Sequence, residues 1–316
     1  MPLISYVVTL YNKETFLPFV LRGLESQRGP FTREFIFVDD GSHDSTVKTL
    51  TAMTASWENV TIITQANAGP AIATNAGLAR AKGDYIKPLD GDDVLAPLAT
   101  AAHLHAMDGT GLGVSLSRKV TTYAADHDTP ESVMSRFSTD IPEFVKIESP
   151  LETSIRRSTV NPSLWMARRD VIERIGPCDP HIFIQDYSIE LRLAADGPLA
   201  ELMGHTVAFP DIAQGRLTDN KAQILHDVSL AAIRFARKAE KLPARYRNIA
   251  LKRAAKRAVS WKTRHGSGSA FALQIIYLKA MLGLAQPTED LEAALCRPFR
   301  EHGKVRIPVV RSENSE

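Results

Sequence analysis

The chain has 316 residues, of which 44% are hydrophobic and 23% charged, and its formal net charge is +2. These values exclude a disordered, collagen-like or low-complexity protein and fit one large globular domain or two smaller ones. Two cysteines, Cys178 and Cys296, are too few for a disulfide framework or a four-cysteine zinc site, which favours a reducing compartment. We expect no secretory signal, because no positively charged start followed by an apolar run opens the sequence, and the longest apolar run, 270–285, is too short to span a bilayer.

The small net charge hides an uneven distribution along the chain. Residues 1–233 contain 20 Lys and Arg against 29 Asp and Glu, whereas residues 234–316 contain 18 against 7. Within the basic part, 12 Lys and Arg and a single acid, Glu240, lie between 234 and 264. The pattern predicts an acidic body followed by a basic region that meets something anionic.

Strands and helices alternate at short intervals through the first 90 residues. Short apolar runs predict strands at 3–9, 34–38, 59–64 and 85–89. Helical spacing predicts helices that begin at Asn12, near Thr46 and at the start of the alanine-rich stretch 71–82. This order favours an α/β fold with a doubly wound sheet, in which ligands bind beyond the carboxyl ends of the strands.

The pattern is weaker in the middle of the chain and helical at its end. Residues 126–150 are polar, contain three prolines and predict a long loop. Order returns with a strand near 163–167 and with helices near 169–175 and 187–195. From about residue 221 onward the chain is predicted to be helical.

Polar clusters follow three of the predicted strands. Tyr11-Asn12 follows the first, Asp39-Asp40-Gly41-Ser42 the second and Asp90-Gly91-Asp92-Asp93 the fourth. Three carboxylates within four residues repel one another unless a cation neutralises them, and hard oxygen ligands of this kind suit Mg²⁺ or Mn²⁺. Each cluster alone also fits a solvated turn or a helix cap, so the argument depends on their combination.

In this order the clusters resemble those of the inverting glycosyltransferases of family 2, which have the GT-A nucleotide-sugar-binding fold. The matching stretches are VVTLYNKETFLPFVLRGLESQ (7–27), EFIFVDDGSHDST (34–46), NAGPAIATNAGLARAKGDYIKPLDGDDVLAP (67–97) and DPHIFIQDYSIELRLAADG (179–197). The resemblance implies a Rossmann-like, doubly wound mixed sheet in a donor-binding and catalytic domain over 1–220. Its donor half would be 1–97 and its acceptor half 98–220, with a basic helical C-terminal region over 221–316.

The resemblance also implies roles for individual residues on the donor side. Thr9, Tyr11 and Asp40 would hold the nucleobase of the donor, and Asp39 would support that edge. Asn67, in the Asn67-Ala68-Gly69 segment, would also belong to the donor site.

Further roles concern the metal and the chemistry. Asp90 would contact the ribose or the metal, and Asp92 would ligate the Mn²⁺ or Mg²⁺ that bridges the donor diphosphate, with Asp93 as nearby support. Asp186 would be the catalytic base that takes a proton from the acceptor hydroxyl. Arg216 would lie over the donor phosphates.

Two departures from the family pattern leave alternatives open. Gln185 stands where the family usually has Glu before the base, and Thr74 stands where it often has Arg. These departures are compatible with a non-catalytic nucleotide-binding scaffold recruited through its basic tail. A nucleotidyltransferase is disfavoured, because residues 10–15 lack the glycines of a phosphate-binding loop.

The resemblance finally implies a substrate class and a location. The donor would be a nucleotide-diphosphate sugar, a UDP-sugar in the first instance, and the acceptor a glycan or lipid-linked saccharide of surface polysaccharide biosynthesis. The basic segment 234–264 would pack on the acidic domain or rest on anionic lipid, and no motif predicts a nucleic-acid partner. We therefore expect a cytoplasmic protein with peripheral contact at the inner face of the cell membrane.

Overall fold

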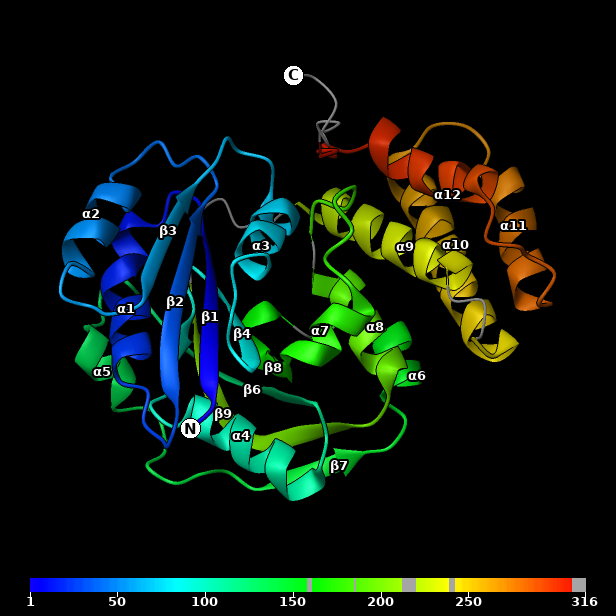
Figure 1. Ribbon diagram of the computed structural model, residues 1–316. Coiled ribbons are helices and arrows are strands. Elements are labelled where there is room, and N and C mark those ends of the chain that lie inside the picture. The colour runs from blue at the N-terminus through cyan, green and yellow to red at the C-terminus, as the bar shows by residue number, and fades with distance from the viewer. Residues whose placement is uncertain (158–160, 185, 212–219, 239–241, 309–316) are drawn as a thin grey trace, which may run out of the picture. The chain divides into compact units, whose positions relative to one another are not determined.

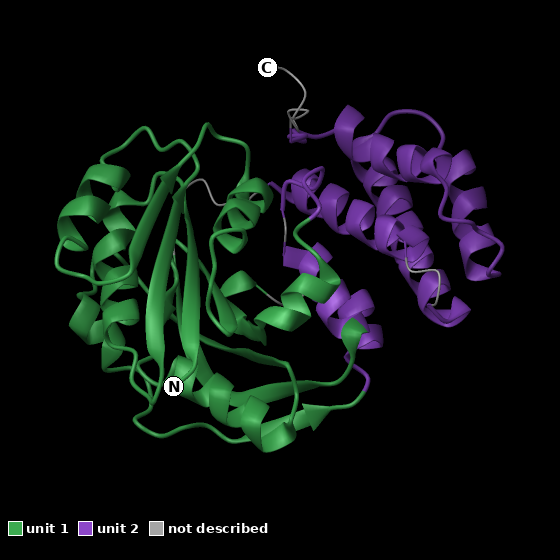
Figure 2. Ribbon diagram, viewed as in Figure 1, with its two compact units in different colours: residues 1–148, 160–178, 196–213 green, residues 149–159, 179–195, 214–316 purple. Residues whose placement is uncertain are grey.

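A computed structural model describes residues 1–157, 161–184, 186–211, 220–238 and 242–308. The chain divides into two compact units (Figure 2). Unit 1 comprises residues 1–148, 160–178 and 196–213, and unit 2 comprises residues 149–159, 179–195 and 214–316. The two units interleave along the sequence. The predicted division into a catalytic domain over 1–220 and a helical region over 221–316 concerns function and stays a prediction.

Unit 1 is built on one mixed sheet (Figure 1). Its strands, within the described residues, are β1 (Leu3–Leu10), β2 (Thr32–Asp39), β3 (Val60–Thr64), β4 (Tyr85–Asp90), β5 (Val94–Leu95), β6 (Val114–Tyr123), β7 (Phe144–Ile147), β8 (Trp165–Arg168) and β9 (Leu199–Pro210). They lie in the order β3-β2-β1-β4-β8-β6-β9-β5, and β7 pairs with β9. β1 to β4 run parallel, whereas β8 is antiparallel to both β4 and β6.

Helices cover both faces of the parallel strands. The helices of unit 1 are α1 (Leu17–Glu25), α2 (Thr46–Met53), α3 (Pro70–Leu78), α4 (Ala99–Thr110), α5 (Pro130–Met134) and α7 (Arg169–Ile175), with short 3₁₀ turns η1 (Glu14–Phe16) and η2 (Pro162–Leu164). Figure 1 shows α1 and α2 on one side of β1 to β3 and α3 on the other. The fold is therefore the predicted doubly wound α/β sheet, which confirms the predicted fold class.

Two predictions for local structure were wrong. The helix expected from Asn12 begins at Leu17, because Asn12 has φ +53° and the chain first turns toward the loop after β2. The long loop expected over 126–150 contains α5 and β7. β7 is an edge strand whose hydrogen bonds come from β9, more than fifty residues later, and a local pattern does not reveal such a partner.

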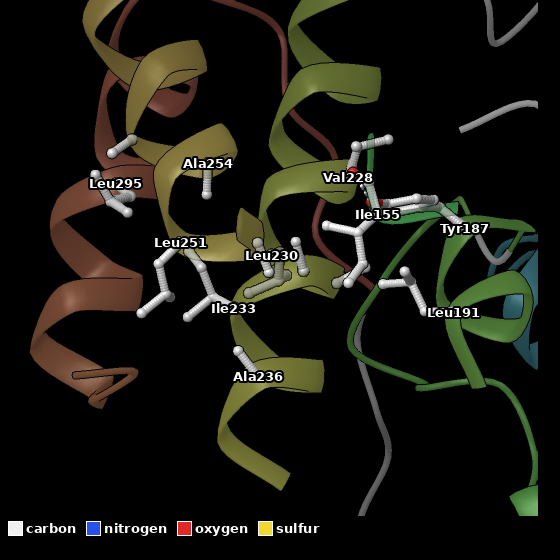
Figure 3. Packing of buried hydrophobic residues seen from close by; sticks show 14 of the residues in the cluster. Ile155, Tyr187, Leu191, Val228, Leu230, Ile233, Ala236, Leu251, Ala254 and Leu295 are labelled. Atoms are coloured by element: carbon white, nitrogen blue, oxygen red, sulfur yellow. Dashed lines mark hydrogen bonds between the residues drawn. The ribbon is translucent and has the colours of Figure 1, made fainter. Parts of the chain in front are cut away.

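Unit 2 is helical and has its own hydrophobic core. Its helices are α6 (Pro150–Arg156), α8 (Asp186–Asp196), α9 (Lys221–Lys238), α10 (Ala244–His265), α11 (Phe271–Met281) and α12 (Glu289–Glu301). Figure 3 shows Ile155, Tyr187 and Leu191 on the α6–α8 side of this core, with Ile233 and Leu251 from α9 and α10. The helical prediction for the region after 221 is confirmed. Within the described ranges, no helix is both long and apolar enough to cross a membrane.

Candidate active site

The carboxyl ends of β1, β2 and β4 meet at one edge of the sheet in unit 1. The strands are parallel, and their register pairs Thr9 with Asp90 and Leu10 with Asp39. The polar clusters that follow these strands are therefore neighbours, although 30 to 80 residues separate them in the sequence. Sheet register, rather than any local contact, assembles the site.

The loops after β1 and β2 are fastened to each other by Asn12. Its backbone N–H donates to Ser42 Oγ at 2.8 Å, and its Oδ1 accepts from the His43 N–H at 2.8 Å. The neighbouring Tyr11 is 40% exposed, and its ring meets the His43 ring edge-on with centroids 6.3 Å apart. The partly exposed Tyr11 ring is thus held beside the loop after β2, and an exposed aromatic ring is a surface on which a flat ligand can stack.

Asp40 fastens the segment that follows β3. Its Oδ1 accepts from Gln65 Nε2 and from the Ala68 N–H, and its Oδ2 accepts from the Gly69 N–H, all at 2.8 Å. Asn67 Nδ2 donates to the Asp40 carbonyl oxygen at 2.8 Å. Two of the residues predicted to bind the donor, Asp40 and Asn67, therefore also fix each other's loops.

Asp39 is buried beside them and has an acceptor atom left over. Its Oδ2 accepts from the Ser42 N–H at 3.1 Å, whereas its Oδ1 has no hydrogen-bond partner among the described residues. A buried carboxylate oxygen without a partner is costly unless a ligand supplies a donor. Gly41 makes the close packing here possible, because a Cβ at this position (φ +76°) would lie 2.8 Å from the Asn67 nitrogen.

The acidic turn after β4 is surrounded by cations and donors. Lys13 Nζ donates to Asp92 Oδ2 at 2.5 Å, which joins the loop after β1 to the acidic turn. Asn161 Nδ2 donates to Asp90 Oδ2 at 3.0 Å, and the Tyr123 hydroxyl donates to the Asp92 carbonyl oxygen at 2.7 Å. Gly91 lets the turn pack on the end of β1, because a Cβ there would lie 2.7 Å from the Thr9 carbonyl oxygen.

Beneath this turn lies a polar network that sequence reasoning missed. Lys87, fully buried in β4, donates to the carbonyl oxygens of Ser163, Trp165 and Pro88. Ser163 Oγ then donates to Asp93 Oδ2 at 2.5 Å and accepts from the Asp90 N–H at 2.9 Å. A lysine in an otherwise apolar strand was the one sequence signal that pointed to this network.

The carboxylates of this turn have strongly perturbed pKa values. Loss of hydration, with the Asp92 charge nearby, raises the pKa of Asp90 to about 6, although Lys13 and the Asn161 hydrogen bond act against the rise. Burial, with Asp92 and Asp90 nearby, raises the pKa of Asp93 well above its usual range. Burial lowers the pKa of Lys87 to about 7, although Asp93 and Asp90 act against that shift. Crowded acidic groups of this kind at a sheet edge are typical of functional sites.

The donor set fits a hard divalent cation with incomplete protein ligation. Within the described part of the chain, no three His, Cys, Asp or Glu side chains are grouped so as to hold a metal ion. Mg²⁺ and similar ions, however, are usually held by one or two carboxylates together with substrate phosphates and water. Asp92 already attracts the Lys13 ammonium, and the charge of Asp92 contributes to the raised pKa of Asp90. These two carboxylates are therefore the candidate ligands.

The predicted base, Asp186, belongs to unit 2. It is the first residue of α8, where the helix dipole favours a negative charge. The chain just before it is held by the buried Asp227, whose Oδ2 accepts from the Ile184 N–H at 2.9 Å. The buried His226 Nδ1 lies 2.7 Å from Asp227 Oδ1 and its Nε2 accepts from Arg300 Nε, so Nδ1 carries the proton. Gln185 and Arg216, two other residues singled out from the sequence, lie outside the described residues.

A mixed, doubly wound α/β sheet of this kind is the architecture of GT-A glycosyltransferases. The family model described as Glycosyl transferase family 2 matches residues 5–176, more than half of the chain. The chain therefore belongs to glycosyl transferase family 2, a family of sugar-transferring enzymes.

Curated relatives match over part of their length. An uncharacterized glycosyltransferase of Haemophilus influenzae is 38% identical over 97 residues, which cover 30% of this chain and 38% of the relative. The amylovoran biosynthesis glycosyltransferase AmsE of Erwinia amylovora is 25% identical over 215 residues, which cover 66% of this chain and 73% of AmsE. The chain thus spans less than two thirds of the Haemophilus protein.

Solved structures share the fold over nearly the whole chain. S. aureus TarS 1-349 in complex with UDP-GlcNAc superposes with a TM-score of 0.64 at 15% identity, covering 100% of this chain and 98% of that one. The mannosyltransferase PcManGT of Pyrobaculum calidifontis, in complex with GDP-Man and Mn²⁺, superposes with a TM-score of 0.53 at 16% identity, covering 95% and 87%. At these identities the similarity establishes the fold alone.

Replacing Lys87 with Met tests the buried network. The variant leaves buried carbonyl oxygens without a donor and removes the buried cation beside Asp90 and Asp93, so we expect the free energy of unfolding to fall by about 3 kcal/mol. Urea denaturation measures this change. The exposed Lys48→Met is the matched control and should change stability by less than about 0.5 kcal/mol. Equal stability of both variants would show that the ammonium does not hold the network together.

Proposed function

We propose that this protein transfers a sugar from a nucleotide-diphosphate sugar, a UDP-sugar in the first instance, to an acceptor hydroxyl with inversion at the anomeric carbon. The observation that carries the proposal is the convergence of three polar clusters at one sheet edge, with Asp92 paired to Lys13. Membership of glycosyl transferase family 2 supports it. The UDP and UDP-GlcNAc complexes of TarS, which has the same fold, support the choice of nucleotide.

Five residues of unit 1 would hold the nucleoside part of the donor. Tyr11 offers a ring face for the base, and Thr9 lines the end of β1 beneath it. Asp39 Oδ1 is the buried acceptor left for a base N–H, while Asp40 would contribute lone pairs that its loop does not use. Asn67 would close the pocket from the segment after β3, and Arg216 is proposed for the donor phosphates.

Asp90 and Asp92 would hold a divalent ion, Mn²⁺ or Mg²⁺, together with the donor diphosphate. When bound, such an ion stabilises the negative charge that grows on the leaving nucleoside diphosphate. Asn161 and Ser163 orient Asp90, and Lys87 fixes the backbone that carries both of them. Mn²⁺ in the PcManGT complex supports this choice of cofactor.

Asp186 would act as the general base. An alcohol is a weak nucleophile, so a carboxylate must accept its proton as the new C–O bond forms and the bond to the diphosphate breaks. A single displacement of this kind inverts the anomeric carbon and passes through an oxocarbenium-like transition state. Asp227 supports the role by fixing the backbone two residues before the base.

The acceptor and the location are proposed by analogy with relatives. AmsE, an amylovoran biosynthesis glycosyltransferase, supports a glycan or lipid-linked saccharide in surface polysaccharide assembly. Both cysteines are buried and unbridged, which supports work in a reducing compartment such as the cytoplasm. The basic segment 234–264 would make peripheral contact with anionic membrane lipid.

Calorimetric titration with nucleotides tests the donor site directly. UDP, GDP, dTDP and CDP are each titrated with Mn²⁺ and with EDTA, and we expect metal-dependent binding of UDP. Asp92→Ala should weaken this binding at least about tenfold, because it removes one of only two carboxylate ligands. Asp126→Ala, at an exposed acid that is not part of the acidic turn, serves as the control. A folded protein that binds none of the four nucleotides would refute the proposal.

The same titration repeated across pH tests the role of Asp90. A metal ion binds the ionised carboxylate, and the raised pKa of about 6 means that Asp90 takes up a proton as the pH falls from 7 to 5. We expect the affinity for UDP with Mn²⁺ to be constant above pH 7 and to fall up to about tenfold per pH unit below 6. In Asp90→Asn this dependence should be lost, and a wild-type profile that stays flat down to pH 5 would contradict the assignment.

Replacing Asp186 with Asn separates donor binding from transfer. The amide keeps the size of the side chain but accepts no proton, so we expect normal UDP binding and transfer reduced by roughly 10²- to 10⁴-fold. Production of the nucleoside diphosphate measures the transfer of sugar, both to the acceptor and to water. Near-normal transfer by this variant would mean that another residue is the base. Tight UDP binding by wild type without transfer to any acceptor would favour the scaffold hypothesis.

A further inference from the structure

Helix α11 carries apolar side chains on two sides. Leu273, Ile276, Tyr277 and Ala280 pack against the hydrophobic core of unit 2, where α11 lies beside α10 (Figure 1). An ordinary surface helix has one apolar stripe that faces the core and a polar face toward water. On its outer side α11 exposes only two polar side chains, Gln274 and Lys279, among apolar ones, so this second apolar side calls for a second partner.

The second side forms a continuous stripe on the surface of unit 2. Phe271, Ile275 and Leu278 are spaced by four and three residues, which places them on one face of the helix, and Leu282, the C-cap residue, continues this spacing. They are 66%, 40%, 55% and 72% exposed, and Met281 beside them is 51% exposed. We call these four residues the α11 stripe. Soluble proteins rarely expose a contiguous apolar patch of this kind unless it is an interaction surface.

The surroundings of the α11 stripe are strongly basic. Residues 242–288, all of which the structure describes, contain nine Lys and Arg and neither Asp nor Glu. Lys279 is exposed on α11 itself, and Lys252 and Lys256 are exposed on the neighbouring α10. Within the described residues, no Lys or Arg of α10 or α11 forms a salt bridge. The positive charge of the exposed Lys252, Lys256 and Lys279 is therefore available to a partner.

These two properties together identify the partner. A symmetric dimer through the stripe would bring the same basic surface against itself, which like-charge repulsion disfavours. A lipid bilayer with anionic headgroups satisfies both features, because the acyl boundary accepts Phe and Leu side chains while the headgroups attract Lys and Arg. We propose that the α11 stripe inserts into the interface of an anionic lipid bilayer. The inference extends the proposed contact of residues 234–264 by assigning the apolar anchor to α11, and it does not depend on the donor site of unit 1.

Vesicle flotation of the full chain tests the proposal. Vesicles contain phosphatidylglycerol and phosphatidylcholine in equal amounts, or phosphatidylcholine alone. Wild type should float with the anionic vesicles only, and less so at 1 M salt, where the Debye length is about 3 Å. Leu278→Glu and Phe271→Glu should each lower the bound fraction at least about tenfold. Met53→Glu, at a residue of unit 1 as exposed as Ile275, is the matched control and should float like wild type.

Each other outcome overturns the proposal. No flotation of wild type, or equal flotation of the stripe variants, excludes the bilayer as partner of α11. If Met53→Glu lost as much vesicle binding as the stripe variants, the total charge of the protein, rather than the α11 stripe, would govern binding. Sedimentation that shows a concentration-dependent dimer, dissolved by Leu278→Glu and without vesicle binding, would identify a second copy as the partner. Far-ultraviolet circular dichroism verifies that the variants fold. UDP titration of the same samples tests the donor site separately, so that a failure of this inference can be distinguished from a failure of the donor site.

Discussion

The negative charge gathered at the end of β4 is the constraint on which the candidate site depends. Asp90, Asp92 and Asp93 lie on one turn, and carboxylates so close together destabilise one another in a partly dehydrated environment. The protein offsets this repulsion with Lys13 at Asp92, with Asn161 at Asp90 and with Ser163 at Asp93. Such a crowded acidic turn is a candidate site for a cation and for the phosphates that a cation brings.

The compensating groups come from distant parts of the sequence, and so they also hold unit 1 together. Lys13 joins the loop after β1 to the turn after β4, and Asn12 joins the same loop to the one after β2. Lys87 fixes the backbone at Ser163 and Trp165 from inside the sheet. The hydrogen bonds that stabilise the fold are therefore the same ones that orient the candidate ligands, so a substitution in this network should alter stability and donor binding together.

Unit 2 combines two different tasks. Its buried polar residues, such as Asp227 and His226, fix the backbone that leads into the candidate base at Asp186. Its helices α10 and α11 carry no acidic residue, and α11 has an apolar stripe that the core does not use. The helical unit therefore carries both the candidate base and the apolar stripe for which we propose a bilayer partner.

The sequence by itself determined the doubly wound sheet, because alternating apolar runs and helical spacings are local patterns. It also determined the acidic turn and the family, because the motifs that carry them are short and contiguous. Only the tertiary structure decided which carboxylate oxygens remain open, since the partners of Asp39 and Asp40 come from loops up to 29 residues away. The same holds for the role of Lys87, the pairing of β7 with β9 and the outer face of α11, because hydrogen bonding, strand pairing and exposure depend on neighbours that are distant in the chain.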